Sequence, residues 1–571
     1  MKFTSLNIKI AGSAGEGIKS VGLTLSKCFS RSGYYTFDYS EYPSLIRGGH
    51  NTYQSHISTF LSTSQISKID ILIALNQDAV KLHQNELKEE SVIIYDPQKV
   101  KLESGEKLCG NYLAIDLNKL AIDAGGTPLM ANIVALGAVM YLTGLDVEVL
   151  KNIISQIFKV KGDKIIVPNQ KAAQAGFEFS QKNAAEHQFP LEKPATESKK
   201  YLLSGNEAIA LGAICAGMQF FAAYPMTPAT GILHYLAQNA KKCNLVVKHS
   251  DDEISAANMV VGASFGGVRS MTATSGGGFC LMTEALGMAG IMELPVVFVN
   301  GMRSGPSTGM PTWHDQGDLL FCVNAGHGEF PKMVVTPGDI KENFDWTRKA
   351  FYYSEKYQLP VVIVTDKYLG ESTQTIENIK PEYKNNRYGF VKNSQKNFLR
   401  YKDSLNGISL RSVPGQENLS YLANSYEHDD YGFATEEIEV RNQQVNKRAK
   451  KMAALALEIS QLEFEIFGNP QADVAIISWG SNKGPILEAL KLLGKNQPAF
   501  LNLAVVWPFP VKQFNDFIKN KKTLINIECN STSQLGQIIR QTTGIKIDKN
   551  LCKFDGRPFY PEEIAEFIKK I

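Results

Sequence analysis

Between residues 201 and 375 the chain repeats one pattern: a short apolar run, a turn rich in Gly, Ser, Thr or Asp, and a helical segment. Apolar runs without polar alternation are typical of strands in a parallel sheet that helices cover on both faces. The predicted strands span residues 220–223, 245–248, 270–273, 295–299 and 360–364. In such sheets the loops after the carboxyl ends of the strands hold the ligand. The pattern therefore predicts an α/β fold and the edge that carries its site.

The rest of the chain predicts a multidomain α/β protein, since 571 residues exceed what one core can bury. Strand, glycine turn, helix and strand follow one another from residue 6, which indicates a first domain with a mostly parallel sheet. Residues 376–450 are polar and precede a charged helix. The predicted parts are a first domain at 1–185, a linker at 186–200, the sheet domain at 201–375, a connecting arm at 376–465 and a C-terminal α/β domain at 466–571.

Composition excludes several classes of protein. The net charge of +3 gives no bulk attraction to nucleic acid. Eight cysteines without a C-x-x-C pair argue against a disulfide framework, a zinc ribbon or a ferredoxin-type cluster, and we expect no metal site in this chain. No apolar run reaches the roughly 18 residues that a bilayer span requires, and the first residues lack the pattern of a secretion signal. We therefore expect a cytoplasmic protein without a membrane partner.

Two segments place side chains suited to a small carboxylic acid. Residues 224–228 read Tyr-Pro-Met-Thr-Pro, and the prolines restrict the backbone around the Thr227 hydroxyl, although a capped helix start would look the same. Arg303 lies among Gly, Ser and Thr at residues 303–312, and a guanidinium can hold a carboxylate by two parallel hydrogen bonds. An ion pair from Arg303 to Asp315 or Asp318 is the alternative.

Two further segments of the same domain also follow predicted strands. His-Ser-Asp-Asp-Glu at residues 249–253 leads into a helix of small residues, where Ser250 and Asp251 are candidate caps and carboxylates complement the helix dipole. Thr274, Ser275 and Gly276 begin a glycine-rich turn that lets a ligand approach the backbone. Tight turns without a ligand use the same residues.

Together these segments resemble the 2-oxoacid:ferredoxin oxidoreductases, which use thiamine diphosphate. The first is similar to the family's Tyr-Pro-Ile-Thr-Pro, and residues 303–312 are similar to its Arg-x-Gly-Pro-Ser-Thr-Gly-x-Pro-Thr. The glycine turn is similar to the family's Thr-Ser-Gly-Pro-Gly, with Gly277 in place of Pro. The resemblance implies an α subunit with a pyrimidine-binding domain at 201–375 and a C-terminal transketolase-C-like domain. Gly12 to Gly17 and Arg47-Gly48-Gly49-His50 resemble the family's γ domain, fused ahead of α.

The resemblance also implies a role for each candidate residue. Glu253 would be the catalytic residue, because its carboxyl would contact N1′ of the aminopyrimidine and activate the cofactor. Thr274, Ser275 and Gly276 would bind the cofactor with it. The substrate-binding residues would be Tyr224, Thr227, Arg303, Thr308 and Thr312.

Half of such a site is missing from the chain, which has no Gly-Asp-Gly and Asn pair to hold Mg²⁺ and the diphosphate. The resemblance therefore implies a β subunit that carries Mg²⁺ and a [4Fe-4S] cluster, in an αβ or (αβ)₂ assembly. The assembled enzyme would decarboxylate a 2-oxoacid, form an acyl-CoA from CoA and reduce ferredoxin.

We expect 2-oxoglutarate as the substrate, with pyruvate, branched-chain and indolepyruvate specificity as alternatives. The loop at residues 12–17 has G-x-x-G-x-G spacing, so a non-catalytic dinucleotide-binding or regulatory subunit is the rival of another class. The role of the γ-like domain stays open.

Overall fold

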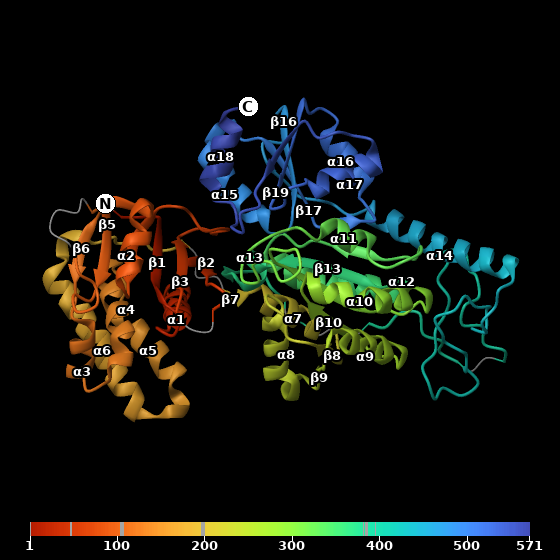
Figure 1. Cartoon of the computed structure of the whole chain (residues 1–571), viewed down its shortest axis with the longest axis horizontal. Coiled ribbons are helices and arrows are strands. Elements are labelled where there is room, and N and C mark those ends of the chain that lie inside the picture. Colours follow the sequence, from red (N-terminus) through yellow and green to blue (C-terminus); the bar gives the residue numbers. More distant parts are fainter. Residues whose placement is uncertain are drawn as a thin grey trace. The chain divides into compact units, whose positions relative to one another are not determined.

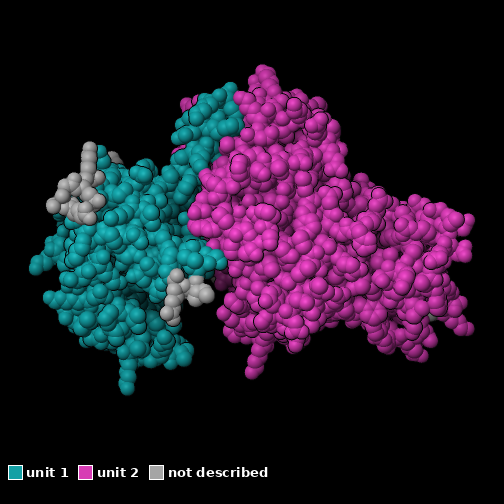
Figure 2. Space-filling view, in the orientation of Figure 1, with its two compact units in different colours: residues 1–203, 372–379, 560–571 teal, residues 204–371, 380–559 magenta. Residues whose placement is uncertain are grey.

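The computed structural model describes residues 2–45, 48–102, 108–195, 200–380, 382, 386–393 and 396–571. It divides into two compact units (Figure 2). Unit 1 comprises residues 1–203, 372–379 and 560–571, and unit 2 comprises residues 204–371 and 380–559. Both units are α/β, which confirms the predicted fold class. The finer division predicted from the sequence stays a prediction, and residues 196–199 of its linker and Arg47 of the γ-like motif lie outside the described residues.

Unit 1 is built on an eight-stranded sheet with the order β6-β5-β4-β1-β3-β2-β14-β7. β1, β4, β5 and β6 are parallel, whereas β3 is antiparallel to β1 and β2. The sheet is therefore mixed, because β2 and β3 form a hairpin whose direction the sequence did not reveal. The strands are β1 Ser5–Ser13, β2 Tyr35–Glu41, β3 His50–Ser58, β4 Ile69–Ala74, β5 Leu87–Tyr95, β6 Asn111–Ala114, β7 Tyr201–Ser204 and β14 Thr373–Ile376. The helices are α1 Ile18–Arg31, α2 Gln77–Leu82, α3 Leu117–Asp123, α4 Ala131–Leu142, α5 Val147–Ile157, α6 Asp163–Asn183 and α18 Pro561–Lys569.

Unit 2 contains a seven-stranded sheet with the order β18-β12-β13-β11-β10-β8-β9. All paired neighbours are parallel except β18, which runs antiparallel to β12. The strands are β8 Phe220–Ala223, β9 Val246–His249, β10 Ser270–Thr274, β11 Val297–Met302, β12 Met333–Val335, β13 Val361–Asp366 and β18 Val505–Trp507. The five predicted strands are all present. β12 was missed because three residues give too short an apolar run.

Helices cover both faces of this sheet, as the apolar strands require. α7, α8 and α12 pack over one face, around Ile209, Ile232 and Phe351. α9 and α10 pack over the other face, around Ala256 and Phe279. The helices are α7 Gly205–Cys215, α8 Thr230–Cys243, α9 Glu253–Phe265, α10 Gly276–Ile291, α11 Leu319–Asn324, α12 Ile340–Tyr357 and α13 Lys367–Glu371. Only the two edges at which the strands end are left uncovered, and the loops lie there.

A second sheet of unit 2, five strands in the order β15-β17-β16-β19-β20, forms the C-terminal part. Its elements are β15 Ile466–Gly468, β16 Val474–Trp479, β17 Ala499–Leu503, β19 Thr523–Glu528, β20 Lys549–Cys552, α15 Lys483–Leu493, α16 Val511–Ile518 and α17 Gln534–Thr543. Because β18 follows β17 and joins the larger sheet, the two sheets share one apolar core. The long helix α14, Ile438–Ile459, lies within the predicted arm and precedes this part, and the arm residues before α14, called the arm from here on, run beside it (Figure 1).

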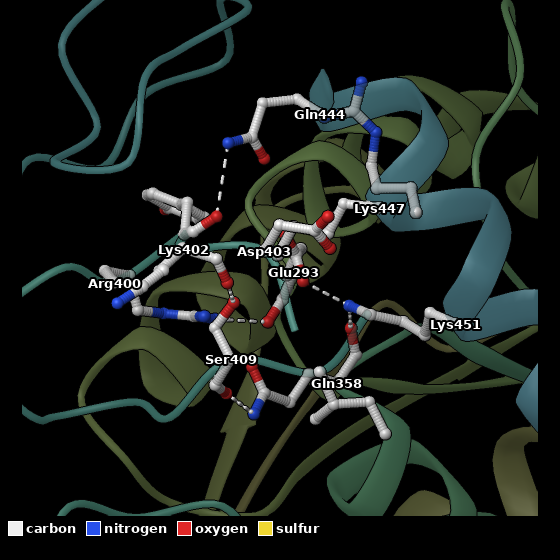
Figure 3. A network of polar contacts seen from close by, with 12 residues as sticks. Glu293, Gln358, Arg400, Lys402, Asp403, Ser409, Gln444, Lys447 and Lys451 are labelled. Carbon is white, nitrogen blue, oxygen red and sulfur yellow. Dashed lines mark hydrogen bonds and ion pairs between the residues drawn. The ribbon is translucent and has the colours of Figure 1, made fainter. Parts of the chain in front are cut away.

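A buried group of charges, the Glu293 cluster (Glu293, Arg400, Lys447 and Lys451), fastens the arm and α14 to the larger sheet (Figure 3). Glu293 is fully buried in the turn between α10 and β11. Lys447 and Lys451 of α14 each pair with its carboxylate, and Arg400 donates to its carbonyl oxygen at 2.9 Å. Burial lowers the pKa of Lys451 to about 7, against the opposing field of Glu293. The arm thus packs on a domain of its own chain.

All eight cysteines are free thiols. Among the described residues, no three His, Cys, Asp or Glu side chains are grouped to hold a metal ion. In the same part of the chain no single helix is long and apolar enough to cross a membrane, and the segments Leu117–Asp123 and Pro128–Leu142 pass that test only as a pair bent by 116°.

Candidate active site

Four neighbouring strands end at one edge of the seven-stranded sheet, and their loops carry the predicted site residues. β9, β8, β10 and β11 lie side by side and are parallel, so their carboxyl ends meet. Tyr224, Ser275 and Arg303 each stand one residue beyond their strand, and Glu253 begins the helix after β9. The fold therefore gathers residues as far apart in the chain as Tyr224 and Arg303, as the strand pattern predicted.

Glu253 is buried in this edge, with 5% of its surface exposed. The Asp252 carboxylate caps α9 by accepting from the Ser255 amide at 2.7 Å, which leaves Glu253 free of that role. Its Oε1 is buried and has no hydrogen-bond partner. Because a buried polar atom without a partner costs about 1–3 kcal/mol, the position points to a ligand that supplies the missing bond.

The glycine turn lies against this carboxylate. A Cβ on Gly278 would lie 2.8 Å from Glu253 Oε1 and would overlap Thr274 Oγ1. Ser275, at the N-terminus of α10, is fully buried, and its hydroxyl neither caps the helix nor has another partner. The turn therefore has no space for a side chain at Gly278, and the Ser275 hydroxyl is free to bind a ligand.

Arg303 and Thr227 are brought together as the sequence predicted. Arg303 Nη1 donates to the Thr227 carbonyl oxygen at 2.9 Å, which fixes the guanidinium beside the Tyr-Pro-Met-Thr-Pro segment. Among the described residues Arg303 forms no ion pair. The predicted alternative, an ion pair with Asp315 or Asp318, is therefore not present. Partial burial lowers the pKa of Arg303, and the field of Asp318 opposes that shift. Its remaining donors are available to a carboxylate.

Asn300 is a site residue that the sequence did not single out, and Asp318, which the sequence offered only as an ion-pair partner of Arg303, contacts Asn300 instead. Asn300, fully buried in β11, donates to Asp318 Oδ2 at 3.2 Å. The same oxygen would overlap a Cβ on Gly276. Burial raises the pKa of Asp318, whereas the hydrogen bond from Asn300 and the charge of Arg303 lower it. An Asn inside an apolar strand was the available signal, since a buried amide needs a polar partner.

The loop after β11 holds the remaining predicted ligands at different depths. Ser304 and Met310 form an isolated antiparallel bridge, so residues 305–309 protrude as an exposed tip. Thr308 is exposed on that tip. Thr312 is buried, and its hydroxyl has no partner. Tyr224 is 39% exposed, with its ring centroid 6.3 Å from that of His249.

The end of this loop is held by the C-terminal part of unit 2. The backbone N–H of Gln316 donates to the Cys529 carbonyl oxygen at 2.7 Å, and the side-chain oxygen of Gln316 accepts from Asn482 at 2.6 Å. Its side-chain nitrogen donates to Asp366 at the end of β13. The carboxyl ends of both parallel sheets thus meet at one buried polar network, which fixes the base of the loop that carries Arg303 and Thr312.

Comparison with known proteins explains this arrangement. A family model described as pyruvate ferredoxin/flavodoxin oxidoreductase matches residues 7–179, and one described as the thiamine-diphosphate-binding part of pyruvate flavodoxin/ferredoxin oxidoreductase matches residues 211–447. The 2-oxoacid:ferredoxin oxidoreductase subunit alpha of Saccharolobus solfataricus is 32% identical and aligns over 98% of this chain and 97% of its own. The chain belongs to the 2-oxoacid:ferredoxin oxidoreductase α-subunit family. The predicted family and the prediction of an oxidoreductase subunit are confirmed.

Other members of the family agree with this assignment. The 2-oxoglutarate synthase subunit KorA of Methanocaldococcus jannaschii is 34% identical over 65% of this chain and 99% of its own length. A solved structure of a 2-oxoglutarate:ferredoxin oxidoreductase from Magnetococcus marinus, with 2-oxoglutarate, coenzyme A and succinyl-CoA bound, has a TM-score of 0.92 and 32% identity, with both chains fully covered. The family fold therefore extends over both units.

The residues present fit the aminopyrimidine half of thiamine diphosphate. The family match places a thiamine-diphosphate-binding domain over this edge of the sheet. Glu253 offers a buried carboxylate oxygen without a partner, and Gly278 lets the backbone of the turn lie close to it. A basic ring nitrogen can share a proton with such an oxygen.

Proposed function

We propose that this chain is the α subunit of an enzyme that oxidatively decarboxylates a 2-oxoacid, with 2-oxoglutarate favoured, to an acyl-CoA and passes the electrons to ferredoxin. The observation that carries the proposal is the buried, partnerless Glu253 Oε1 at the meeting point of four strand ends. The relatives named for 2-oxoglutarate support the substrate, and the neighbour with bound coenzyme A supports CoA as the acyl acceptor.

In this proposal each side chain has one task. Glu253 would share a proton with N1′ of the aminopyrimidine through Oε1, and Ser275, Thr274 and Gly276 would line the same pocket. Stabilisation of the negative charge that decarboxylation leaves on the substrate is the chemistry that bound thiamine diphosphate supplies.

Arg303 would hold the substrate carboxylate by two parallel hydrogen bonds, since a planar guanidinium matches that geometry. Thr227, Thr312 and Tyr224 would add hydrogen bonds around it. Thr308 would reach the substrate only if the exposed tip of its loop folds inward.

The missing half of the site would come from a β subunit that brings Mg²⁺, the diphosphate-binding residues and a [4Fe-4S] cluster, in an αβ or (αβ)₂ assembly. Its docking face would be the exposed side of α9 and α10. There Ile254 and Leu281 are about half exposed, and a Cβ on Gly262 or Gly277 would meet nothing within 4 Å. Exposed apolar side chains beside open glycines suit close packing of a partner helix.

The test is co-expression with the β subunit and an assay of CoA-dependent reduction of ferredoxin or a viologen dye. Glu253→Gln should lower kcat by two or more orders of magnitude, about the contribution of a positioned acid–base group. The matched control is Asp251→Asn, an exposed carboxylate two residues away that should keep full activity. Full activity of the Gln variant would refute the assigned role.

The substrate panel separates the remaining alternatives. Activity with pyruvate, a branched-chain oxoacid or indolepyruvate, but not with 2-oxoglutarate, would keep the mechanism and replace the substrate. Bound nicotinamide cofactor and no oxoacid-dependent turnover would favour the non-catalytic dinucleotide-binding subunit.

A further inference from the structure

Unit 2 has a cavity of about 490 Å³ at the sheet edge opposite the candidate active site. Its lining includes Cys215, which ends α7 before β8 begins, and Arg269, which directly precedes β10. Both positions lie at the amino-terminal edge of the parallel sheet. A strand of five residues such as β10 spans about 17 Å, so this cavity shares no wall with the Glu253 site.

Behind the cavity lies the Glu355 cluster (Glu355, Arg269, Arg387 and Arg411). Glu355 is 1% exposed. Its carboxylate accepts hydrogen bonds from Arg269 at 3.0 Å, from Arg387 at 2.6 Å and from Arg411 at 2.6 Å. Three guanidinium groups share one carboxylate, which leaves two positive charges in excess. Burial lowers the pKa of Arg411 to about 9, the field of Glu355 opposes the shift, and the neighbouring arginines add to it.

Two more cations of α12 line the cavity, Arg348 and Lys349. Asp345, the acidic residue of the same wall, pairs with Lys341 at 2.7 Å. Among the described residues neither Arg348 nor Lys349 forms an ion pair. Arg348 lies over the Phe344 ring at 5.4 Å and Lys349 over the Trp346 ring at 4.2 Å, which restrains both side chains before any ligand arrives.

The rest of the wall is apolar or aromatic except for Asn386, whose carbonyl oxygen accepts a hydrogen bond from Arg269. The rings of Tyr352 and Tyr388 meet edge to face with centroids 5.3 Å apart. Lys356 donates a hydrogen bond to the Tyr352 hydroxyl at 2.8 Å, and this hydroxyl donates to Glu458 at 3.2 Å. Tyr352 therefore presents the surface of its ring to the cavity. A ligand with a carbon skeleton would contact these rings and Cys215.

We propose that this cavity binds a small organic anion with at least two negative charges, held by Arg348 and Lys349 in the positive field of the Glu355 cluster. A low-dielectric wall with excess charge concentrates the opposite charge in front of it. A phosphate ester and a di- or tricarboxylate share the required chemistry. Because the arm supplies Tyr388 and α12 supplies both cations, a bound anion would join the arm to the sheet domain.

The test is isothermal titration of the full-length chain with adenosine monophosphate, citrate and inorganic phosphate at one ionic strength. We expect saturable binding of at least one of the first two, tighter than inorganic phosphate, and which of the two binds decides the source of the charge. Arg348→Gln with Lys349→Gln should weaken that binding at least tenfold. The matched control, Lys512→Gln with Lys519→Gln, removes two exposed charges on and beside α16 and should bind as the unmodified chain does.

The melting temperature of each variant separates binding from folding. The cavity variant, Arg348→Gln with Lys349→Gln, breaks no ion pair, so its melting temperature should equal that of the control variant. If its melting temperature is lower, binding is measured with Lys349→Gln alone, which should also weaken it at least tenfold. A swapped variant, Arg348→Lys with Lys349→Arg, keeps both charges and should still bind. The absence of saturable binding, or equal weakening in the cavity and control variants, would overturn the proposal.

Discussion

Replacement of Glu293 by Gln keeps the shape of the side chain and removes the carboxylate that the two buried lysines Lys447 and Lys451 share, while the bond from Arg400 to the Glu293 carbonyl oxygen remains. Lys447 and Lys451 are at most 1% exposed at their side chains, so water cannot take over the role of the carboxylate. Removal of one partner from a buried ion pair costs about 3–5 kcal/mol. The cost should fall on α14 and the arm, since these are the elements that the cluster attaches to the larger sheet (Figure 3).

Hydrogen exchange of the full-length chain, followed by mass spectrometry, measures this cost locally. A single unfolding free energy is not defined for a chain of several domains. A loss of about 3 kcal/mol corresponds to an opening constant of α14 raised by roughly 100-fold. Peptides from residues 438–459 should therefore lose protection, whereas those from β10 and β11 should change little.

Two further variants sharpen the result. Glu284→Gln removes an exposed carboxylate from α10, the helix that ends just before Glu293, and should leave exchange unchanged. Glu293→Gln with Lys451→Met removes one of the stranded cations and should recover part of the protection. If Glu293→Gln exchanges in α14 as the control does, the cluster does not hold that helix and the electrostatic reasoning is wrong.

Three further predictions follow from single sites. Gly278→Ala places a Cβ where it overlaps Thr274 and crowds Glu253, so turnover of the assembled enzyme should fall by roughly 100-fold, the cost of about 1 Å of misplacement. Gly287→Ala on the same helix, whose Cβ would make only an ordinary contact with Phe330 at 3.8 Å, is the control, and equal turnover of the two variants would contradict the geometry. Arg303→Lys should raise KM for the oxoacid at least tenfold, because an ammonium cannot form the two parallel bonds; an unchanged KM would remove Arg303 from the substrate site. Asp38 is buried, which raises its pKa to about 7 from 3.8, so its protonated form favours folding below the unfolded pKa and that stability, at most about 4 kcal/mol, is lost as pH rises through 7. Asp38→Asn should make the protection of β2 and β3, which is the exchange rate corrected for the pH-dependent intrinsic rate, independent of pH between 5 and 8, and an unaltered pH dependence of protection would contradict the assignment.

The sequence by itself determined the α/β class, most strand positions and the chemistry of the four loops. These signals are local: an apolar run of four to six residues and the turn after it are enough to place β8, β10 and β11. The rule that ligands bind at the carboxyl ends of parallel strands then placed Glu253 and Arg303 at the same edge before any contact was known.

Only the tertiary structure decided which of these residues meet and what holds them. Strand order is not written in a local pattern, so the contact of Arg303 with Thr227 and the closeness of Asp318 to Gly276 appear only once β10 lies between β8 and β11. The same holds for Gln316, whose partners Asn482 and Cys529 lie 166 and 213 positions later in the chain. Side chains with ordinary local preferences become a buried network or an unpartnered carboxylate through burial, and burial is a property of the packed chain.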